Sequence, residues 1–376
     1  MNTAPPATNG PPSTSTLPDL FVSSVGDPIL GLRVYGTESV RTFPAEPWEL
    51  LRVANDPSAE VYINDPSVTR RGSSGFGHAT IRRQGPSLIV ADAGSKNGTF
   101  LEGEARGLFE LRAGGVVTFG AVAMVAMSAR TEAVRTRFMR FLGFHPSYLL
   151  NVEHAAYAAI RRLHVIAHVP PGGFDGLARM FHETAPGTAW PLYVVNDRIP
   201  NDVAAQRAIL RRSRLGTLVV PAEFWPADST TLREALIAPR RDQRLIFVLP
   251  RVDSDKKKAP PAEHYLGREL RDLSVSIDEP PLAVRGAMEI DRMIHTSAQE
   301  YGVPLGLAGP VFSPSEMQML TSTAWAGNAE ELDVNVRRVT RVRLVGLERA
   351  AELETIDVDS LRRWMKRRRF PLTTTS

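Results

Sequence analysis

The hydrophobic pattern of this chain changes sharply near residue 129. From about Pro28 to Ser128, short alternating apolar runs are separated by Gly, Pro and Asp, which is typical of an antiparallel β-sandwich. After Ala129, helical stretches alternate with short apolar runs, which is the pattern of a parallel α/β domain. A wholly helical part is expected from about Ser313, where Ser-Pro-Ser-Glu predicts a helix N-cap.

The 376 residues are enough for two domains of ordinary size. The first 24 residues are rich in Pro, Thr, Ser and Asn and bury too little apolar surface to offset the entropy of ordering, so we predict disorder there. The predicted division is a disordered tail (1–24), a β-sandwich (25–130), an α/β domain (131–308) and a helical lid with a basic tail (309–376).

Composition excludes several functional classes. The chain has no cysteine, which rules out disulfides, thiolate zinc sites and a cysteine nucleophile. No apolar run approaches the roughly 20 residues of a membrane helix, so we expect a soluble, cytoplasmic protein without a membrane partner. The net charge of +4 comes from arginine clusters interleaved with acids, a pattern that favours solvated helix faces over a nucleic-acid groove.

The most informative stretch is Asp92–Phe100, a polar turn between two strand-like runs. Its Asn97-Gly98 pair alone indicates a tight hairpin, because both residues tolerate positive φ angles. Three upstream features add to it, namely Arg52, a Thr69-Arg70-Arg71 segment and His78. Together these residues resemble a forkhead-associated (FHA) domain, a β-sandwich that binds phosphothreonine peptides through loops at one end.

The resemblance assigns a role to each of these residues. Arg52 would bind the phosphate, Thr69 would supply the hydroxyl of the family's Ser-x-x-His stretch, and Asn97 would hold the peptide backbone. This set suits a phosphate dianion, which needs an arginine fork, a hydroxyl donor and an amide for the peptide main chain. Lys96 is a further candidate cation. His78 and Gly98 are expected to be structural, since no nucleophile pattern lies near His78.

Two features depart from the family pattern. Leu51 precedes Arg52, where the family has glycine, and six residues, Gly72–Gly77, are inserted before His78. Three roles remain open for the insertion: it repositions Thr69, it supplies Ser73 or Ser74 as a substitute hydroxyl, or it is a flexible excursion. We therefore include Ser74 as a weaker candidate for peptide binding.

The second half is similar to the AAA+ domain of sigma-54-dependent transcriptional activators. The resemblance is carried by four segments: Val165–His182, which aligns with a strand, P-loop and helix; Leu215–Val220, which resembles a Walker B strand; Pro280-Pro281-Leu282 with Arg285; and Trp325–Leu332, which resembles the family's lid motif. The family implies an ATPase that acts on the sigma factor.

The catalytic residues of that family are missing here. After Gly173, Phe174 stands where the P-loop lysine would bind phosphates, and Pro221 and Ala222 replace the Walker B acids. Glu330 replaces the lid arginine and reverses its charge. The span 196–215 is too short for the loop that contacts the sigma factor. We therefore predict a pseudo-ATPase scaffold that is not an enzyme, without cofactor or metal.

The C-terminus shows one amphipathic basic helix, Leu361–Arg369. A helix-turn-helix needs two helices around a turn, so we predict a terminal packing helix, and DNA is not favoured as a partner.

The function predicted from the sequence is a phosphothreonine-binding adaptor in Ser/Thr-kinase signalling. Its partner would be a phosphothreonine protein or its own phosphorylated tail at Thr14, Thr16 or Thr373–Thr375, with a Ser/Thr kinase or an AAA+ protein as further partners. The alternative is a sigma-54-dependent transcriptional regulator that binds ATP or acts with an active AAA+ partner. In the adaptor hypothesis the AAA+-like domain is a catalytically silent docking surface. A third hypothesis is a transcriptional regulator that keeps partner or DNA contact without ATP.

Overall fold

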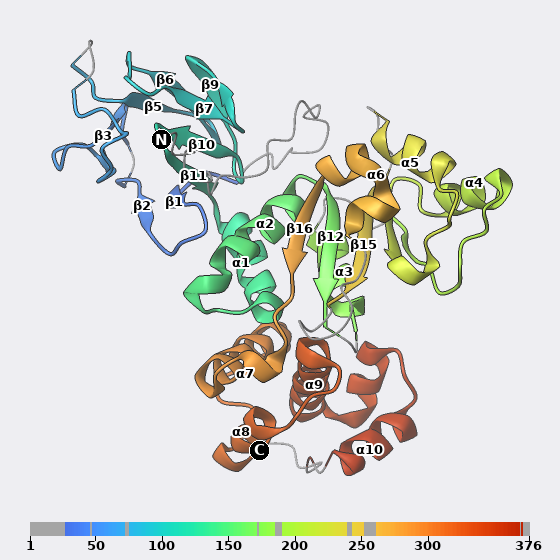
Figure 1. Ribbon diagram of the computed structural model, residues 1–376. Helices are drawn as coiled ribbons and strands as arrows, with labels where there is room; N and C mark the ends of the chain where they lie inside the picture. The colour runs from blue at the N-terminus through green and yellow to red at the C-terminus, as the bar shows by residue number, and fades with distance from the viewer. Residues whose placement is uncertain are drawn as a thin grey trace.

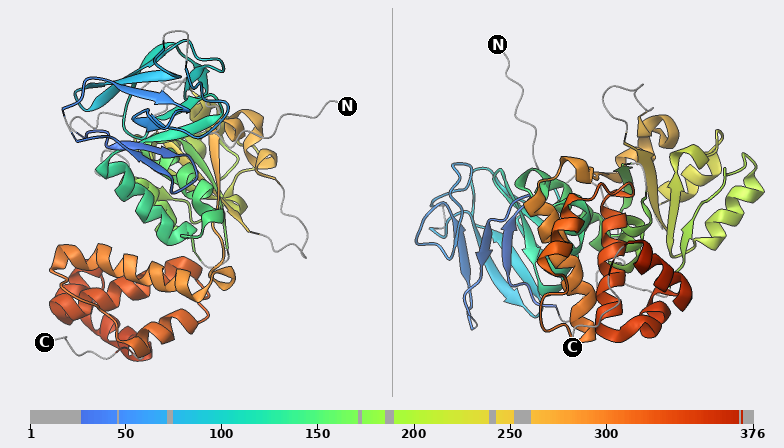
Figure 2. Two further views of the ribbon diagram at one scale, coloured as in Figure 1. Left: turned by 90° about the vertical axis from the view of Figure 1, so that its left-hand side faces the viewer. Right: turned by 90° about the horizontal axis from the view of Figure 1, so that it is seen from below.

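The computed structural model has three parts, which follow one another along the chain (Figure 1). A β-sandwich comes first, an α/β unit follows, and a helical subdomain ends the chain. The sandwich and the helical subdomain lie at opposite ends of the molecule (Figures 1 and 2). The structure describes residues 27–45, 47–71, 75–170, 173–184, 190–238, 243–251, 261–368 and 370. The predicted disordered tail, Ser73, Ser74 and Thr373–Thr375 lie outside these residues.

The sandwich is built from two sheets. The larger has the order β2 (Val40–Thr42), β1 (Gly31–Val34), β11 (Val122–Met127), β10 (Val116–Phe119), β7 (Thr99–Leu101) and β8 (Glu104–Ala105). The smaller has the order β4 (Val61–Tyr62), β3 (Leu51–Ala54), β5 (Ala79–Gln84), β6 (Ser87–Asp92) and β9 (Leu108–Leu111). All pairs are antiparallel except the short parallel pair β3–β4. The predicted sandwich is confirmed.

Alternating side chains give the larger sheet two buried faces. Leu32 and Met124 point inward and pack with Leu51 and Val53 of the smaller sheet. Their neighbours on the other face, such as Val125, pack against helices of the α/β unit. A strand whose two faces are both covered needs apolar or paired residues at every position, and this explains the dense apolar run of β11.

The α/β unit holds a five-stranded parallel sheet of order β13 (Leu192–Val194), β14 (Thr217–Pro221), β15 (Arg244–Pro250), β12 (His164–Val169) and β16 (Ser274–Asp278). Helices α1 (Ala129–Leu142), α2 (Leu149–Ile160) and α3 (Asp175–Thr184) share a core with one face. Helices α4 (Val203–Arg212), α5 (Thr230–Ile237) and α6 (Ala262–Asp272) share a core with the other. The sequence missed β16, since Ser274 and Ser276 interrupt its apolar run.

The helical subdomain consists of α7 (Ala287–Gly302), α8 (Pro314–Ser322), α9 (Asn328–Glu354) and α10 (Val358–Arg367). The predicted N-cap is confirmed, because Ser313 and Glu316 form a reciprocal capping box at the start of α8. The predicted boundary at residue 309 is wrong. Helix α7 packs against α8 and α9 (Figure 1), so the subdomain begins at Ala287.

The predicted C-terminal helix is α10, and a short helix that was not predicted precedes it. Gly346 breaks α9 with a φ of 79°, and the segment after it is a helix that ends at Glu354. Thr355 then adopts the left-handed conformation, and α10 starts at an Asp357 cap. Two helices therefore flank a short turn. The turn escaped sequence analysis because Thr355, unlike Gly or Asn, gives no signal for positive φ.

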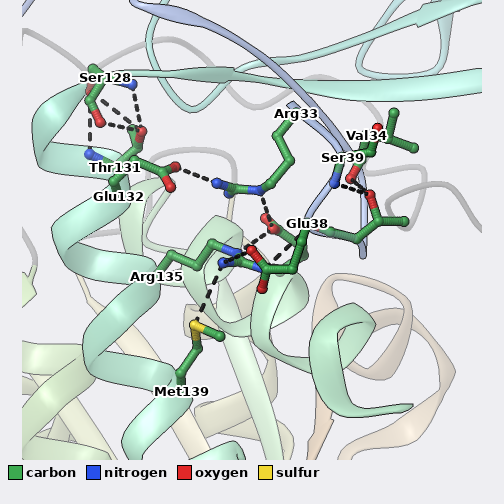
Figure 3. Close-up of polar contacts among 11 residues, drawn as sticks. Arg33, Val34, Glu38, Ser39, Ser128, Thr131, Glu132, Arg135 and Met139 are labelled. Atoms are coloured by element: carbon green, nitrogen blue, oxygen red, sulfur yellow. Dashed lines mark hydrogen bonds and ion pairs between the residues drawn. The ribbon is translucent and has the colours of Figure 1, made fainter. Parts of the chain in front are cut away.

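A buried network of charged residues joins the sandwich to the α/β unit (Figure 3). Glu153 of α2 accepts from Arg33 of β1 at 2.9 Å and from Arg135 of α1 at 2.7 Å. Arg33 also contacts Glu132, and Arg135 contacts Glu38 in the β1–β2 turn. Glu153, Arg33 and Arg135 are each at most 4% exposed. The two units are therefore held by paired, buried charges rather than by a linker alone.

No helix in the described part of the chain is long and apolar enough to cross a membrane.

Candidate functional site

Four loops meet at one end of the sandwich, and the Asp92–Phe100 turn is one of them. It runs from β6 in the smaller sheet to β7 in the larger sheet, so it joins two sheets and closes no hairpin. Of the Asn97-Gly98 pair, only Gly98 has a positive φ, of 79°. The Gly98 carbonyl accepts from the amide of Gly120 in the β10–β11 turn. The turn therefore connects loops of both sheets.

Asp92 holds this turn in shape. One carboxylate oxygen accepts from the amides of Gly94 and Ser95, at 2.9 Å each. The other accepts from the hydroxyls of Ser95 and Thr99, at 2.6 Å each. Burial alone would raise the pKa of Asp92, but these hydrogen bonds outweigh it and hold the pKa below its usual value. Asp92 is thus a site residue that sequence reasoning treated only as part of the turn.

His78 joins two loops. Its Nδ1 lies 3.0 Å from the amide nitrogen of Thr69, and its Nε2 lies 3.0 Å from the carbonyl oxygen of Gly98. An amide can only donate and a carbonyl can only accept, so Nδ1 must be unprotonated and Nε2 must carry the hydrogen. The buried ring is thus a neutral tautomer that fixes Thr69 beside the turn.

This geometry predicts a pH dependence. Burial lowers the pKa of His78, while the Gly98 hydrogen bond and the Asp92 charge act in the opposite direction. An unfolded histidine has a pKa of about 6.5, so just below that value the unfolded chain binds more protons than the folded chain. We expect the contribution of His78 to the free energy of unfolding to be complete above pH 6.5 and to fall as the pH drops below it.

The measurement is urea denaturation between pH 5 and pH 8 for the wild type and for His78→Gln. Subtracting the free energy of unfolding of the variant from that of the wild type at each pH removes the contribution of the other titrating groups. A wild-type curve that runs parallel to the variant's curve over this range would contradict the assignment of a neutral histidine.

Thr69, Lys96 and Asn97 are brought together as the sequence analysis expected. The Thr69 hydroxyl oxygen accepts from the amide of Lys96 at 3.0 Å, and the Asn97 side-chain amide donates to the Ser67 carbonyl at 2.7 Å. The Thr69 hydroxyl hydrogen has no acceptor among the described residues. The side-chain carbonyl oxygen of Asn97 likewise receives no hydrogen bond from them. Both groups remain able to bind a ligand.

Arg52 does not join this group. It lies inside β3, in register with Thr80, and its guanidinium bonds to the Ser58 carbonyl at 2.6 Å and to Glu60 at 3.3 Å. The residue that leaves β3 beside Thr69 is Asn55, whose amide donates to the Thr69 carbonyl. The prediction that Arg52 lies in the site is therefore wrong. A Gly-Arg pair at 51–52 would need the strand to end there, but β3 continues past Arg52 to Ala54.

Other cations lie beside Thr69. Arg70 is exposed and lies 3.5 Å from Asp56, and Arg71 and Lys96 are also exposed. The side chains of Arg71 and Lys96 have no hydrogen bond or ion pair with the described residues. The loop end is thus cationic without Arg52. The inserted segment is described only from Gly75, so Ser74 lies outside the description.

Of the positions of the second predicted site, Gly173 and Glu330 lie side by side. Phe174, in place of the P-loop lysine, packs against the large core. Pro221 and Ala222 at the end of β14 are buried and carry no acid. The Glu330 carboxylate accepts from the amide of Gly176 at 2.9 Å and lies beside Gly173. No cluster of metal ligands occurs in the parts of the chain that the structure describes.

A comparison with protein-family models matches residues 54–120 to the FHA domain. This segment is an FHA domain. The match includes Thr69, His78, Lys96 and Asn97 and begins two residues after Arg52, in agreement with the geometry of the loops.

Two curated relatives resemble the FHA domain, both named oxoglutarate dehydrogenase inhibitor. The protein from Corynebacterium jeikeium is 29% identical over 85 residues, which are 23% of this chain and 55% of that protein. The protein from Corynebacterium diphtheriae is 36% identical over 69 residues, or 18% and 44%. The chain thus spans about half the length of the curated relatives it matches.

A longer likeness is to the crystal structure of NtrX from Brucella abortus in complex with ADP. It covers 61% of this chain and 70% of that chain, at 13% identity and a TM-score of 0.35.

Proposed function

We propose that this protein is a phosphothreonine-binding adaptor in Ser/Thr-kinase signalling. The observation that carries the proposal is the Thr69 hydroxyl, whose oxygen is held by the Lys96 amide while its hydrogen is left to donate. Because cationic side chains lie around this hydroxyl, a phosphate oxygen is the acceptor that fits it best. Arg70, Arg71 and Lys96 would supply the positive charge, and Asn97 would bond the peptide main chain.

Matched peptides test this proposal. Calorimetry or a pull-down would compare a degenerate peptide library with fixed phosphothreonine against the same library with threonine. We expect binding only to the phosphorylated library. The double variant Arg70→Ala, Arg71→Ala should lose about tenfold or more in affinity, because each charge-assisted hydrogen bond contributes about 1.5–3 kcal/mol.

Arg52→Ala is the matched control, since Arg52 is engaged by Glu60; its affinity should stay within about twofold. Equal binding of both libraries would overturn the adaptor proposal. Phosphorylation-dependent binding that survives the double variant but is lost in Arg52→Ala would overturn only the assignment of the cations.

The first protein partner to test is oxoglutarate dehydrogenase, because both corynebacterial relatives are named as its inhibitors. The phosphorylated tails of this chain are the second.

We also propose that the α/β unit is an inactive ATPase that serves as a scaffold. The proposal is supported by Phe174 in the core, by the absence of acids at Pro221 and Ala222, and by a carboxylate, Glu330, at the start of α3. Phosphate binding at that place needs cations and free amides. Titration calorimetry with Mg-ATP should show no binding; micromolar binding would favour the ATP-dependent regulator instead.

A second candidate function is DNA binding, and the turn at Thr355 favours it. The helices on either side of that turn have the order of a helix-turn-helix, whose second helix enters the major groove. The exposed face of α10 carries Arg362, Arg363, Lys366 and Arg367. If it binds duplex DNA, Lys366→Ala should lower the slope of log affinity against log salt by about 0.9. Absence of salt-dependent binding would remove this candidate.

A further inference from the structure

One face of α9 presents two carboxylates to the α/β unit. Glu330 and Asp333 are three residues apart and therefore lie on the same side of the helix. Glu330 Oε1 accepts from the Gly176 amide in the first turn of α3, at 2.9 Å. Asp333 Oδ1 lies 3.3 Å from Arg140 of α1, a side chain that is 4% exposed. Each carboxylate thus meets positive charge, a helix N-terminus in one case and a guanidinium in the other.

The Glu330 carboxylate fills the space above the start of α3. A Cβ atom at Gly173 would lie 2.5 Å from Glu330 Oε2, and one at Gly176 would lie 3.4 Å from Glu330 Cδ. Glycine at position 173 lets the carboxylate approach the backbone this closely. Glu330 Oε2 is buried without a hydrogen-bond partner. The fit is close enough that Glu330 stands where a bound anion would otherwise face these amides.

The neighbouring contacts hold α9 in this position. Asp333 accepts from the hydroxyls of Ser297 at 2.8 Å and Tyr301 at 2.6 Å, both on α7. Arg140 also pairs with Glu300 of α7 at 3.0 Å. Because α7 and α9 both belong to the helical subdomain, these bonds orient the two carboxylates toward the α/β unit.

We propose that Glu330 is an internal latch, which occupies the anion position at the start of α3 and keeps the helical subdomain closed on the α/β unit without a bound nucleotide. The latch goes beyond adaptor function and does not depend on phosphopeptide binding. The latch gives Glu330 a structural role, whereas a comparison with active ATPases would show only that the lid arginine is lost.

The latch should also respond to pH. Burial, and then the charge of Asp175, raise the pKa of Glu330 to about 7, against the hydrogen bond from Gly176. The acids facing it are Asp175 of α3, Asp333 of α9 and Glu279 after β16, whose own pKa burial raises to about 8. A raised carboxyl pKa means that the folded chain binds the proton more tightly. The latch is therefore strongest when Glu330 is protonated and accepts from Gly176 through its carbonyl oxygen, and it weakens as the pH rises from the ordinary carboxyl range to about 7.

Hydrogen exchange followed by mass spectrometry tests the latch on the full chain. In Glu330→Ala, the segments at the start of α3 and of α9 should exchange about tenfold faster than in the wild type, while the FHA domain is unchanged. Glu330→Gln keeps an acceptor for the Gly176 amide but cannot ionise. After exchange rates are divided by the intrinsic rate at each pH, Glu330→Gln should be protected as well as the wild type at pH 5 and should keep the protection that the wild type loses between pH 5 and pH 7. Glu352→Ala, in the segment of α9 after Gly346 and with an exposed partner, Arg349, is the control.

The outcomes separate clearly. Unchanged exchange in Glu330→Ala overturns the latch, and so does a Glu330→Gln variant that keeps the wild-type pH dependence. If Glu330→Ala unfolds the whole chain, Glu330→Asp carries the same prediction, because its shorter side chain keeps the charge but withdraws it from Gly176. Titration of the wild type with Mg-ATP tests the inactive-ATPase proposal independently of these results.

Discussion

Replacing Glu153 by alanine should lower the free energy of unfolding by about 3–5 kcal/mol, the usual cost of breaking a buried ion pair by removing one partner. Glu153 lies between Arg33 and Arg135, and all three side chains are almost fully buried. Without it, two guanidinium groups remain in a low-dielectric interface with only their more exposed partners, Glu132 and Glu38. Urea denaturation of the full chain measures the loss, and small-angle scattering measures separation of the units.

Glu38→Ala is the matched control for this prediction. Glu38 pairs with the same Arg135, but its side chain is 60% exposed. A pair with one exposed partner contributes about 0–1 kcal/mol, so the control should be nearly neutral. Equal losses in the two variants would mean that burial of Glu153 does not govern the joint between the units.

Asp92→Ala should have the second largest effect, with a loss of about 2–4 kcal/mol in stability and at least a tenfold loss in phosphopeptide affinity. The variant removes the acceptors of two amides and two hydroxyls. One of these hydroxyls belongs to Thr99, which is buried and has no access to water. The turn that positions Lys96 and Asn97 would then lose its shape. Denaturation and peptide titration give the two values.

Glu110→Ala controls for loss of a carboxylate on the same domain, since Glu110 is exposed and pairs with Arg112 at the surface. Asp92→Asn should be intermediate, because the amide keeps one acceptor. Wild-type affinity in a folded Asp92→Ala variant would show that the shape of the turn is not needed for binding.

Much of the FHA domain could be predicted from local sequence. Period-two alternation marks β5, and continuous apolar runs mark β10 and β11, which are covered on both faces. His78 and the Asp92–Phe100 turn could be placed because together with Thr69 they resemble the FHA pattern. Strands β2, β8 and β9 were missed, and each of them has exposed residues in place of a continuous apolar run.

The placement of Arg52 failed for a different reason. The local sequence Leu50-Leu51-Arg52 is compatible with an arginine in the middle of a strand and with one at its end. Which residue leaves β3 is decided by pairing with β5 and β4, which are distant in sequence. The same limit applies to Asp92, whose partners are known only once the turn is folded.

The sequence by itself determined the succession of a β-sandwich, an α/β domain and a helical part, and the residue types that stand at the loop end with Thr69, Lys96 and Asn97. These are properties of residue type and short-range period. Only the tertiary structure decided that Glu330 meets the amide of Gly176 and that Glu153 joins two units, because both contacts pair residues more than a hundred positions apart or on separate elements. Such pairings depend on how whole helices pack, and helix packing leaves no local signal in the chain.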